Sequence, residues 1–205
     1  MLESIAMKIV DFPNNSKAFE IAQNLLTEAK KNEPEITLVI ENIATILKAT
    51  VVGLENKFKS KESLTRKLTD LAVRFHIPID KIAYKNNDTL RYTLVFSDDE
   101  YANGFGFVTK EFKQIGYQIG KIWNAWQNEG LVNDLGYRGI NITIISSQKY
   151  RFELQLHTEE CFTLKTETHG LYEELRNLEI SESRKSAVIK EMVKLAEKLN
   201  RPKGI

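Results

Sequence analysis

The segment from Lys57 to Lys67 has the composition of a binding site for a polyphosphate. Its sequence, KFKSKESLTRK, carries five basic residues against one acid, Glu62. It stands at a predicted helix start, where free backbone N–H groups and the positive end of the helix dipole also attract anions. The alternative is a basic helix face exposed to solvent, and the segment taken alone favours that alternative.

Acidic residues stand at two predicted strands. Asp88 comes directly before TLRYTLVF, and Glu153 lies inside YRFELQLH. Alternate side chains of a strand point to opposite faces, so Glu153, Gln155 and His157 share a face opposite the apolar residues between them. Such a polar row is typical of the solvent face of an edge strand. With Asp88 nearby, it also has the carboxylates that hold Mg²⁺ beside substrate phosphates.

A third group of candidate residues lies in GYRGIN, residues 136–141. The ring of Tyr137 is of a kind that stacks on a nucleobase, and the guanidinium of Arg138 is of a kind that pairs with a phosphate. Glycine followed by tyrosine at a strand start is also common as packing. The motif alone therefore leaves both interpretations open.

The elements that must position these residues follow from apolar periodicity and strand-forming composition. Helices are predicted over residues 16–31, 35–54, from 60 to Pro78, from the Ser97–Glu100 capping pattern onward, 159–176 and 182–200. Strands are predicted over residues 89–96, 117–126, 137–146 and 150–157, the last two forming a hairpin. This order predicts an α/β or α+β domain, with a mixed sheet of about four or five strands and helices packed on it.

Composition points to one globular domain. The 205 residues are 42% hydrophobic and 28% charged, with no repeat or linker, which is ordinary for one compact unit. The 29 basic and 28 acidic residues nearly balance, so overall charge argues for neither nucleic acid nor membrane. The lone Cys161 fits a reducing, cytoplasmic setting. The opening residues MLESIAMKIVDF predict no secretion signal, and charges interrupt the most apolar stretch, which predicts no membrane span.

Taken in order, four segments resemble the successive motifs of the RelA/SpoT nucleotide pyrophosphokinase domain. They are KFKSKESLTRKL, NDTLRYTLVF, GYRGINITI and FELQLHTEECFTLKTETHGLYEE, and they run from Lys57 to Arg176. The resemblance implies a nucleotidyltransferase-like fold in a single domain, 1–205. Residues 1–56 would be N-terminal helices, 57–176 the catalytic core and 177–205 a C-terminal helix. Members of the family move the β,γ-pyrophosphate of ATP to a ribose 3′-hydroxyl, classically of GDP or GTP.

The resemblance also implies a role for each matching residue. Asp88 would hold Mg²⁺, Glu153 would act with the metal or as the base, and Tyr137 would stack on the acceptor base. The ATP phosphates would be held by Lys57, Lys59, Ser63, Lys67 and Arg91. The further acceptor-side residues would be Arg138, Asn141, Gln155, His157 and His169.

Several positions depart from the family pattern. Thr93 stands where the family has an arginine, with Arg91 the nearest substitute, Asn141 stands where it has a histidine, and His157 where an arginine is frequent. Residues 133–135 lack the basic residues that commonly precede the tyrosine motif. These changes predict poor use of GDP and GTP while leaving the ATP side intact.

RYT after Asp88 and GIN after Tyr137 resemble versions of the domain found in secreted toxins and in small toxic synthetases. A toxin implies an antitoxin or immunity protein as partner, and adenine nucleotides or a tRNA 3′ end as further acceptors. The chain lacks the His-Asp motif of the family's hydrolase domain, so we expect synthesis only. The alternative is an inactive nucleotide- or partner-binding domain, against which the presence of Asp88 and Glu153 argues.

Overall fold

The computed structural model describes residues 15–127, 135–176 and 180–205. Five strands form one mixed sheet in the order β1-β2-β5-β4-β3, in which only β2 and β5 run parallel. The strands are β1 (Thr50–Val52), β2 (Arg91–Phe96), β3 (Gln118–Asn124), β4 (Ile140–Ile145) and β5 (Arg151–Thr158). The α-helices are α1 (Asn15–Ile46), α2 (Lys61–Phe75), α3 (Ile79–Lys85), α4 (Asp98–Gln114), α5 (Glu159–Glu167), α6 (His169–Leu175) and α7 (Glu182–Ala196). The predicted α+β fold class, with a mixed sheet of four or five strands, is confirmed.

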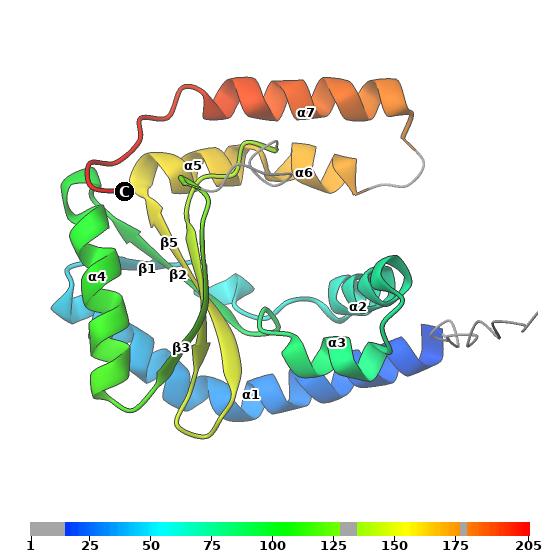
Figure 1. Cartoon of the computed structure of the whole chain (residues 1–205), viewed down its shortest axis with the longest axis horizontal. Helices are drawn as coiled ribbons and strands as arrows, with labels where there is room; N and C mark the ends of the chain where they lie inside the picture. Colours follow the sequence, from blue (N-terminus) through cyan, green and yellow to red (C-terminus); the bar gives the residue numbers. More distant parts are fainter. Residues whose placement is uncertain (1–14, 128–134, 177–179) are drawn as a thin grey trace, which may run out of the picture.

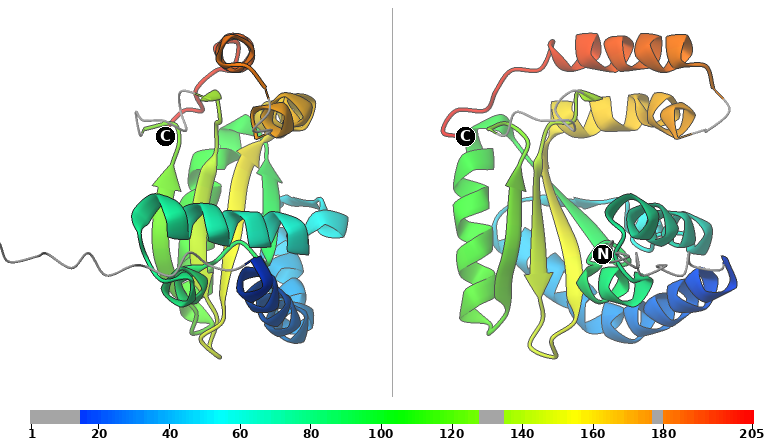
Figure 2. Two further views of the ribbon diagram at one scale, coloured as in Figure 1. Left: turned by 90° about the vertical axis from the view of Figure 1, so that its right-hand side faces the viewer. Right: turned by 45° about the vertical axis from the view of Figure 1, so that its right-hand side comes forward.

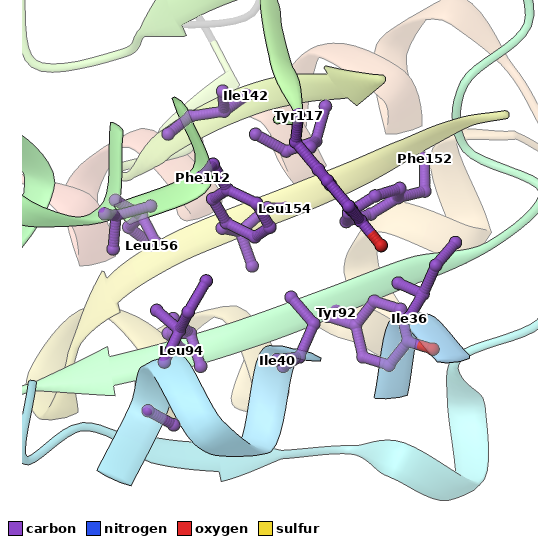
Figure 3. Packing of buried hydrophobic residues seen from close by; sticks show 14 of the residues in the cluster. Ile36, Ile40, Tyr92, Leu94, Phe112, Tyr117, Ile142, Phe152, Leu154 and Leu156 are labelled. Carbon is purple, nitrogen blue, oxygen red and sulfur yellow. The ribbon is translucent and has the colours of Figure 1, made fainter. Parts of the chain in front are cut away.

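One face of the sheet is covered by α1 and α4 and forms the main core (Figure 1). Phe152 of the central strand β5 is fully buried there, with aromatic neighbours from β2 and α4: its ring centroid lies 6.0 Å from that of Tyr92 and 6.1 Å from that of Phe112. Figure 3 shows Ile36 and Ile40 of α1 beside the side chains of β2. This apolar face fixes which side chains of β5 must point the other way.

Helix α1 serves two hydrophobic clusters. Its C-terminal half packs on the sheet through residues such as Ile36 and Ile40. Its N-terminal half extends past the sheet, where Ala18 and Ala22 pack against buried residues of α2 and α3. The long helix thereby holds α2 and α3 beside the sheet (Figure 1), and this places Lys67 of α2 beside Asp88.

The C-terminal helix α7 lies over α5 and α6 on their outer side, as both views in Figure 2 show. It also contacts the loop before β4, where a Cβ on Gly136 would lie 2.7 Å from the carbonyl oxygen of Met192. Gly136 has φ +75°, so a glycine is required by conformation as well as by space. After α7 the chain returns to α4, where Gly204 approaches Ala102.

Two expectations for the N-terminal region are wrong. No break separates residues 31 and 35, because α1 continues through Pro34. Proline removes one helical hydrogen bond, but Ala29 and Ile36 are buried in the same cluster on either side of it, which holds the helix together. The predicted second helix ends early, since residues 50–52 form β1, a β-branched run that pairs with β2.

Three further boundaries differ from the prediction. Helix α3 was not expected; it begins after Pro78 and buries only Ile79. The predicted helix 159–176 is divided at Thr168, whose hydroxyl donates to the Leu164 carbonyl. The strand expected from Tyr137 begins at Ile140, so Tyr137 lies in the preceding loop.

The predicted β4–β5 hairpin is confirmed, with Ile145 opposite Arg151. The opening residues used to argue against a secretion signal, and residues 133–134, lie outside the described part of the chain. Within the described ranges, no helix has the length and apolar character needed to cross a membrane.

Two glycines in α4 provide a matched test of this packing. A methyl group at Gly104 would overlap the buried ring of Phe96, whereas one at Gly106 would meet no atom within 4 Å. We expect Gly106→Ala to raise the free energy of unfolding by about 0.5–1 kcal/mol through helix propensity. Gly104→Ala should lower it by about 1–2 kcal/mol, because overpacking outweighs that gain. Urea unfolding of both variants measures this, and a stabilised Gly104→Ala would contradict the packing.

Candidate active site

The face of the sheet opposite the main core carries a row of polar side chains. On β5, Glu153, Gln155 and His157 alternate with buried apolar residues, as predicted. β5 is the central strand, so this row is not the solvent face of an edge strand. Arg91 of β2 lies opposite Glu153, and Asn141 of β4 lies opposite Gln155, which extends the polar face across three strands.

Asp88, just before β2, is held by two lysines. Its Oδ2 accepts from Lys59 Nζ at 2.8 Å and its Oδ1 from Lys67 Nζ at 2.6 Å. Burial would raise the pKa of this carboxyl, but the charges of Lys67 and Lys59 outweigh burial and lower the pKa to about 2. The carboxylate is thus charged at neutral pH.

Backbone pairing explains why these residues meet. The amide of Lys59 donates to the Thr89 carbonyl, and the amide of Arg91 donates to the Lys57 carbonyl. The chain before α2 is therefore joined to the chain entering β2, which places Lys59 beside Asp88. Lys67 is in the second turn of α2, and it also borders a cavity of about 710 Å³ between α2 and α3.

The rest of the basic segment does not join this pair. Lys57 forms an ion pair with Glu33 of α1 at 2.7 Å. The Lys61 ammonium lies over the ring of Phe19, 3.9 Å from its centroid. The backbone N–H of Ser63 donates to the Ser60 hydroxyl, the N-cap of α2, so it is not a free donor at the helix start.

Glu153 belongs to a second charged group that includes a residue missed by sequence reasoning. Burial raises the pKa of Glu153, and the neighbouring charge of Asp88 raises it further. Its Oε2 accepts from Gln155 Nε2 at 2.8 Å, and Gln155 Oε1 accepts from Lys165 Nζ at 2.6 Å. Burial, with the charge of Arg91, lowers the pKa of Lys165 to about 8. The sequence contains one signal that could have identified Lys165. Helix α5 follows β5 without a loop, with Thr158 as its N-cap, so a lysine two turns into the helix lies back over the strand.

Tyr137 contacts residues from three strands. Trp123 of β3 stacks on its ring, with centroids 5.3 Å apart and planes inclined by 18°. The Tyr137 hydroxyl donates to Asn141 Oδ1 at 2.6 Å and lies 3.2 Å from His157 Nε2. Gly139 passes so close to His157 that a Cβ there would lie 2.7 Å from Cε1. Burial lowers the pKa of His157 to about 3, so its ring is neutral where an arginine was expected from the family pattern.

The side chains of two predicted acceptor-side residues do not join these groups. The guanidinium of Arg138 donates to the carbonyl of its neighbour Tyr137. His169 is the first residue of α6 and is exposed.

The charges of the site do not balance. Four cations, Lys59, Lys67, Arg91 and Lys165, act electrostatically on one another or on the two carboxylates, Asp88 and Glu153. No cluster of three or more acidic, histidine or cysteine ligands occurs among the residues described. Mg²⁺ does not need such a cluster, because it commonly binds through one or two carboxylates together with substrate phosphates. The face is therefore suited to a polyanion accompanied by Mg²⁺.

The buried His157 predicts a dependence of stability on pH. Below pH 6.5 the unfolded chain binds a proton that the folded chain excludes until about pH 3, so a falling pH favours unfolding. Between pH 7.5 and pH 5 this group should remove about 2 kcal/mol from the free energy of unfolding. Urea unfolding across this range should show that His157→Gln loses about 2 kcal/mol less of its free energy of unfolding than the wild type does. The control His76→Gln, at an exposed position, should lose as much as the wild type. Equal pH slopes for wild type and His157→Gln would contradict a neutral buried His157.

No protein-family model matches the chain, and no curated protein matches its sequence. Solved structures do match. Type VI effector Tas1, in complex with its immunity protein, is 17% identical, with a TM-score of 0.54 over 85% of this chain and 94% of the matched chain. Small alarmone synthetase 1 from Bacillus subtilis, bound to its product pppGpp, is 14% identical, with a TM-score of 0.59 over 85% of this chain and 89% of its own.

Small alarmone synthetase 2 from Bacillus subtilis is 18% identical, with a TM-score of 0.57 over 85% of this chain and 90% of its own. The expected resemblance is therefore confirmed at the level of architecture. The chain has the fold of the small alarmone synthetases and of the Tas1 effector.

Proposed function

We propose that this chain transfers the β,γ-pyrophosphate of ATP to the 3′-hydroxyl of a purine nucleotide, with Mg²⁺ as cofactor. The observation that carries the proposal is the excess of positive charge around Asp88 and Glu153 on one face of the sheet. A triphosphate supplies the negative charge that this face lacks. Phosphoryl-type transfer needs mainly such positioning and charge compensation.

Lys59 and Lys67 serve the donor in this proposal. Each ammonium has three donor hydrogens, so each can bind a phosphate oxygen while still bonded to Asp88. The charge of Arg91 acts on both Lys59 and Lys165, so its guanidinium adds to the positive charge of the same face. Lys57 belongs to the donor side only if it leaves Glu33 when ATP binds. Ser63 would contribute its hydroxyl, because its backbone N–H is bonded to Ser60.

Asp88 would hold Mg²⁺, because its charged carboxylate supplies the hard oxygen ligands that this ion prefers. Glu153 would stand near the metal and act as the base, since burial and the neighbouring charge of Asp88 raise its pKa. Bound there, Mg²⁺ would neutralise charge on the phosphates during transfer.

The acceptor would lie on the Tyr137 side of the polar face. One face of the Tyr137 ring is covered by Trp123, so a base would stack on the other face. The acceptor O3′ forms a bond to the β-phosphorus of ATP, the bond from that phosphorus to the α,β-bridging oxygen breaks, and AMP leaves. The hydroxyl proton passes to Glu153, whose raised pKa suits a general base.

A toxin with a protein inhibitor is the biological role that we favour. Tas1 has a related fold and was solved with its immunity protein, so we propose an antitoxin or immunity protein as partner of this chain. ATP and purine acceptors are abundant in the cytoplasm, where the reaction would take place. No hydrolase activity is expected.

The first test is transfer of label from ATP to a panel of GDP, GTP, ADP, AMP and deacylated tRNA. Asp88→Asn and Glu153→Gln should each reduce the rate by about 10²-fold or more, because they remove charge that acts in the transition state. The matched controls Asp70→Asn and Glu160→Gln alter exposed carboxyls on α2 and α5 and should retain the wild-type rate. Near-normal turnover in either site variant would remove that residue from catalysis. ATP binding without transfer to any acceptor would instead support an inactive nucleotide-binding domain.

The second test concerns acceptor stacking. Tyr137→Ala should weaken acceptor binding by about 1–3 kcal/mol, measured by calorimetry, because a π-face is lost. Tyr137→Phe keeps the ring and should keep most of the affinity, although it loses the hydroxyl contact to Asn141. The exposed Tyr84→Ala is the control. Unchanged affinity in Tyr137→Ala would contradict the stacking role. A steep fall of activity with salt would identify tRNA in place of a nucleotide as the acceptor.

A further inference from the structure

Lys165, Gln155 and Glu153 form a chain of hydrogen bonds that joins α5 to the polar face. Lys165 Nζ donates to Gln155 Oε1 at 2.6 Å, and Gln155 Nε2 donates to Glu153 Oε2 at 2.8 Å. Gln155 is 8% exposed, so water competes little for these bonds. The other carboxylate oxygen of Glu153, Oε1, makes no hydrogen bond within the described residues.

With Lys165 charged and Glu153 ionised, only one orientation of the Gln155 amide keeps both hydrogen bonds. An ammonium can only donate, and an ionised carboxylate can only accept. Turning the amide by 180° would place its NH₂ group against Lys165 and its oxygen against Glu153, which loses both bonds and creates two repulsive contacts. Lys165 therefore determines which end of the amide faces Glu153.

We infer that Lys165 is a positioning residue, which orients the Glu153 carboxylate through Gln155 and leaves Oε1 directed to the reacting hydroxyl. The inference deepens the proposed function and rests on it for the role of Glu153. A buried ammonium is costly to maintain, and the lowered pKa of Lys165 reflects that cost. Its hydrogen bond to Gln155 is the contact that orienting Glu153 requires.

Two simpler roles for Lys165 must be separated from this one. The ammonium lies 5.7 Å from the Phe162 ring centroid, so the side chain also packs within α5. The charge of Arg91 also acts on Lys165, so the two cations together could bind a nucleotide phosphate directly. Lys165→Met keeps the aliphatic volume and removes donor and charge, whereas Lys165→Arg keeps both donor and charge.

The kinetic test is a double-mutant cycle of Lys165→Met and Gln155→Leu. Each single variant should lower kcat by about 10–100-fold with little change in KM, as is found when a group that orients a ligand of the active site is removed. The double variant should be no slower than the slower single variant, because both changes break the same chain. Lys165→Arg should recover most of the rate. The inference would be overturned if the kcat losses of the two single variants multiplied in the double variant. A raised KM with unchanged kcat in Lys165→Met would also overturn it, in favour of direct phosphate binding.

A second measurement does not depend on activity. The side-chain NH₂ signals of Gln155 in a ¹H–¹⁵N spectrum can be identified by their loss in Gln155→Leu. They should move in Lys165→Met and stay in place in Lys190→Met, a control at an exposed position of α7. Unmoved signals in Lys165→Met would overturn the inference whatever the activity. Signals that move in a protein with no transferase activity would support the hydrogen-bond chain and count against the proposed reaction.

Discussion

The alternation of side chains along β5 is the constraint on which the site depends. β5 is the central strand, so one of its faces must supply the main core, where Phe152, Leu154 and Leu156 are fully buried. Because the side-chain period of a strand is two, the residues between them must point to the opposite face. A slip of one residue in pairing would exchange the two faces. The packing of the core thus fixes where Glu153 and Gln155 lie.

Local patterns predicted most of this framework. The period-two pattern of YRFELQLH gave the two faces of β5 correctly, and the turn after β4 gave the hairpin. Weaker elements were not predictable in the same way. β1 is three residues long and is stabilised by pairing with β2, and α3 is held by packing of Ile79 against its neighbours. For such short segments the tertiary contacts decide the structure, and these are not visible in a local window.

Sequence motifs identified most residues of the candidate site, but they did not identify the contacts between segments that are distant in the chain. Asp88 and Lys59 were both singled out, but their ion pair depends on pairing of the chain around Lys57 with the chain around Thr89. Lys165 was missed because its position over β5 depends on the direction in which α5 leaves the strand. The stack of Trp123 on Tyr137 depends on the β3–β4 register, which is shifted by an irregularity between Ile119 and Ile122. No property of either aromatic residue alone indicates that contact.

The two hydrophobic clusters joined by α1 have a consequence for the order in which the protein opens. The cluster of α2 and α3 is smaller than the main core and contains only α1 residues besides its own. Small clusters at the edge of a domain open in partial unfolding events that leave the main core intact. Lys67 belongs to this smaller unit, whereas Asp88 is joined to the sheet. Any ligand that bridges the two should therefore slow amide hydrogen exchange in α2 and α3 more than in the sheet, because it binds only the closed state.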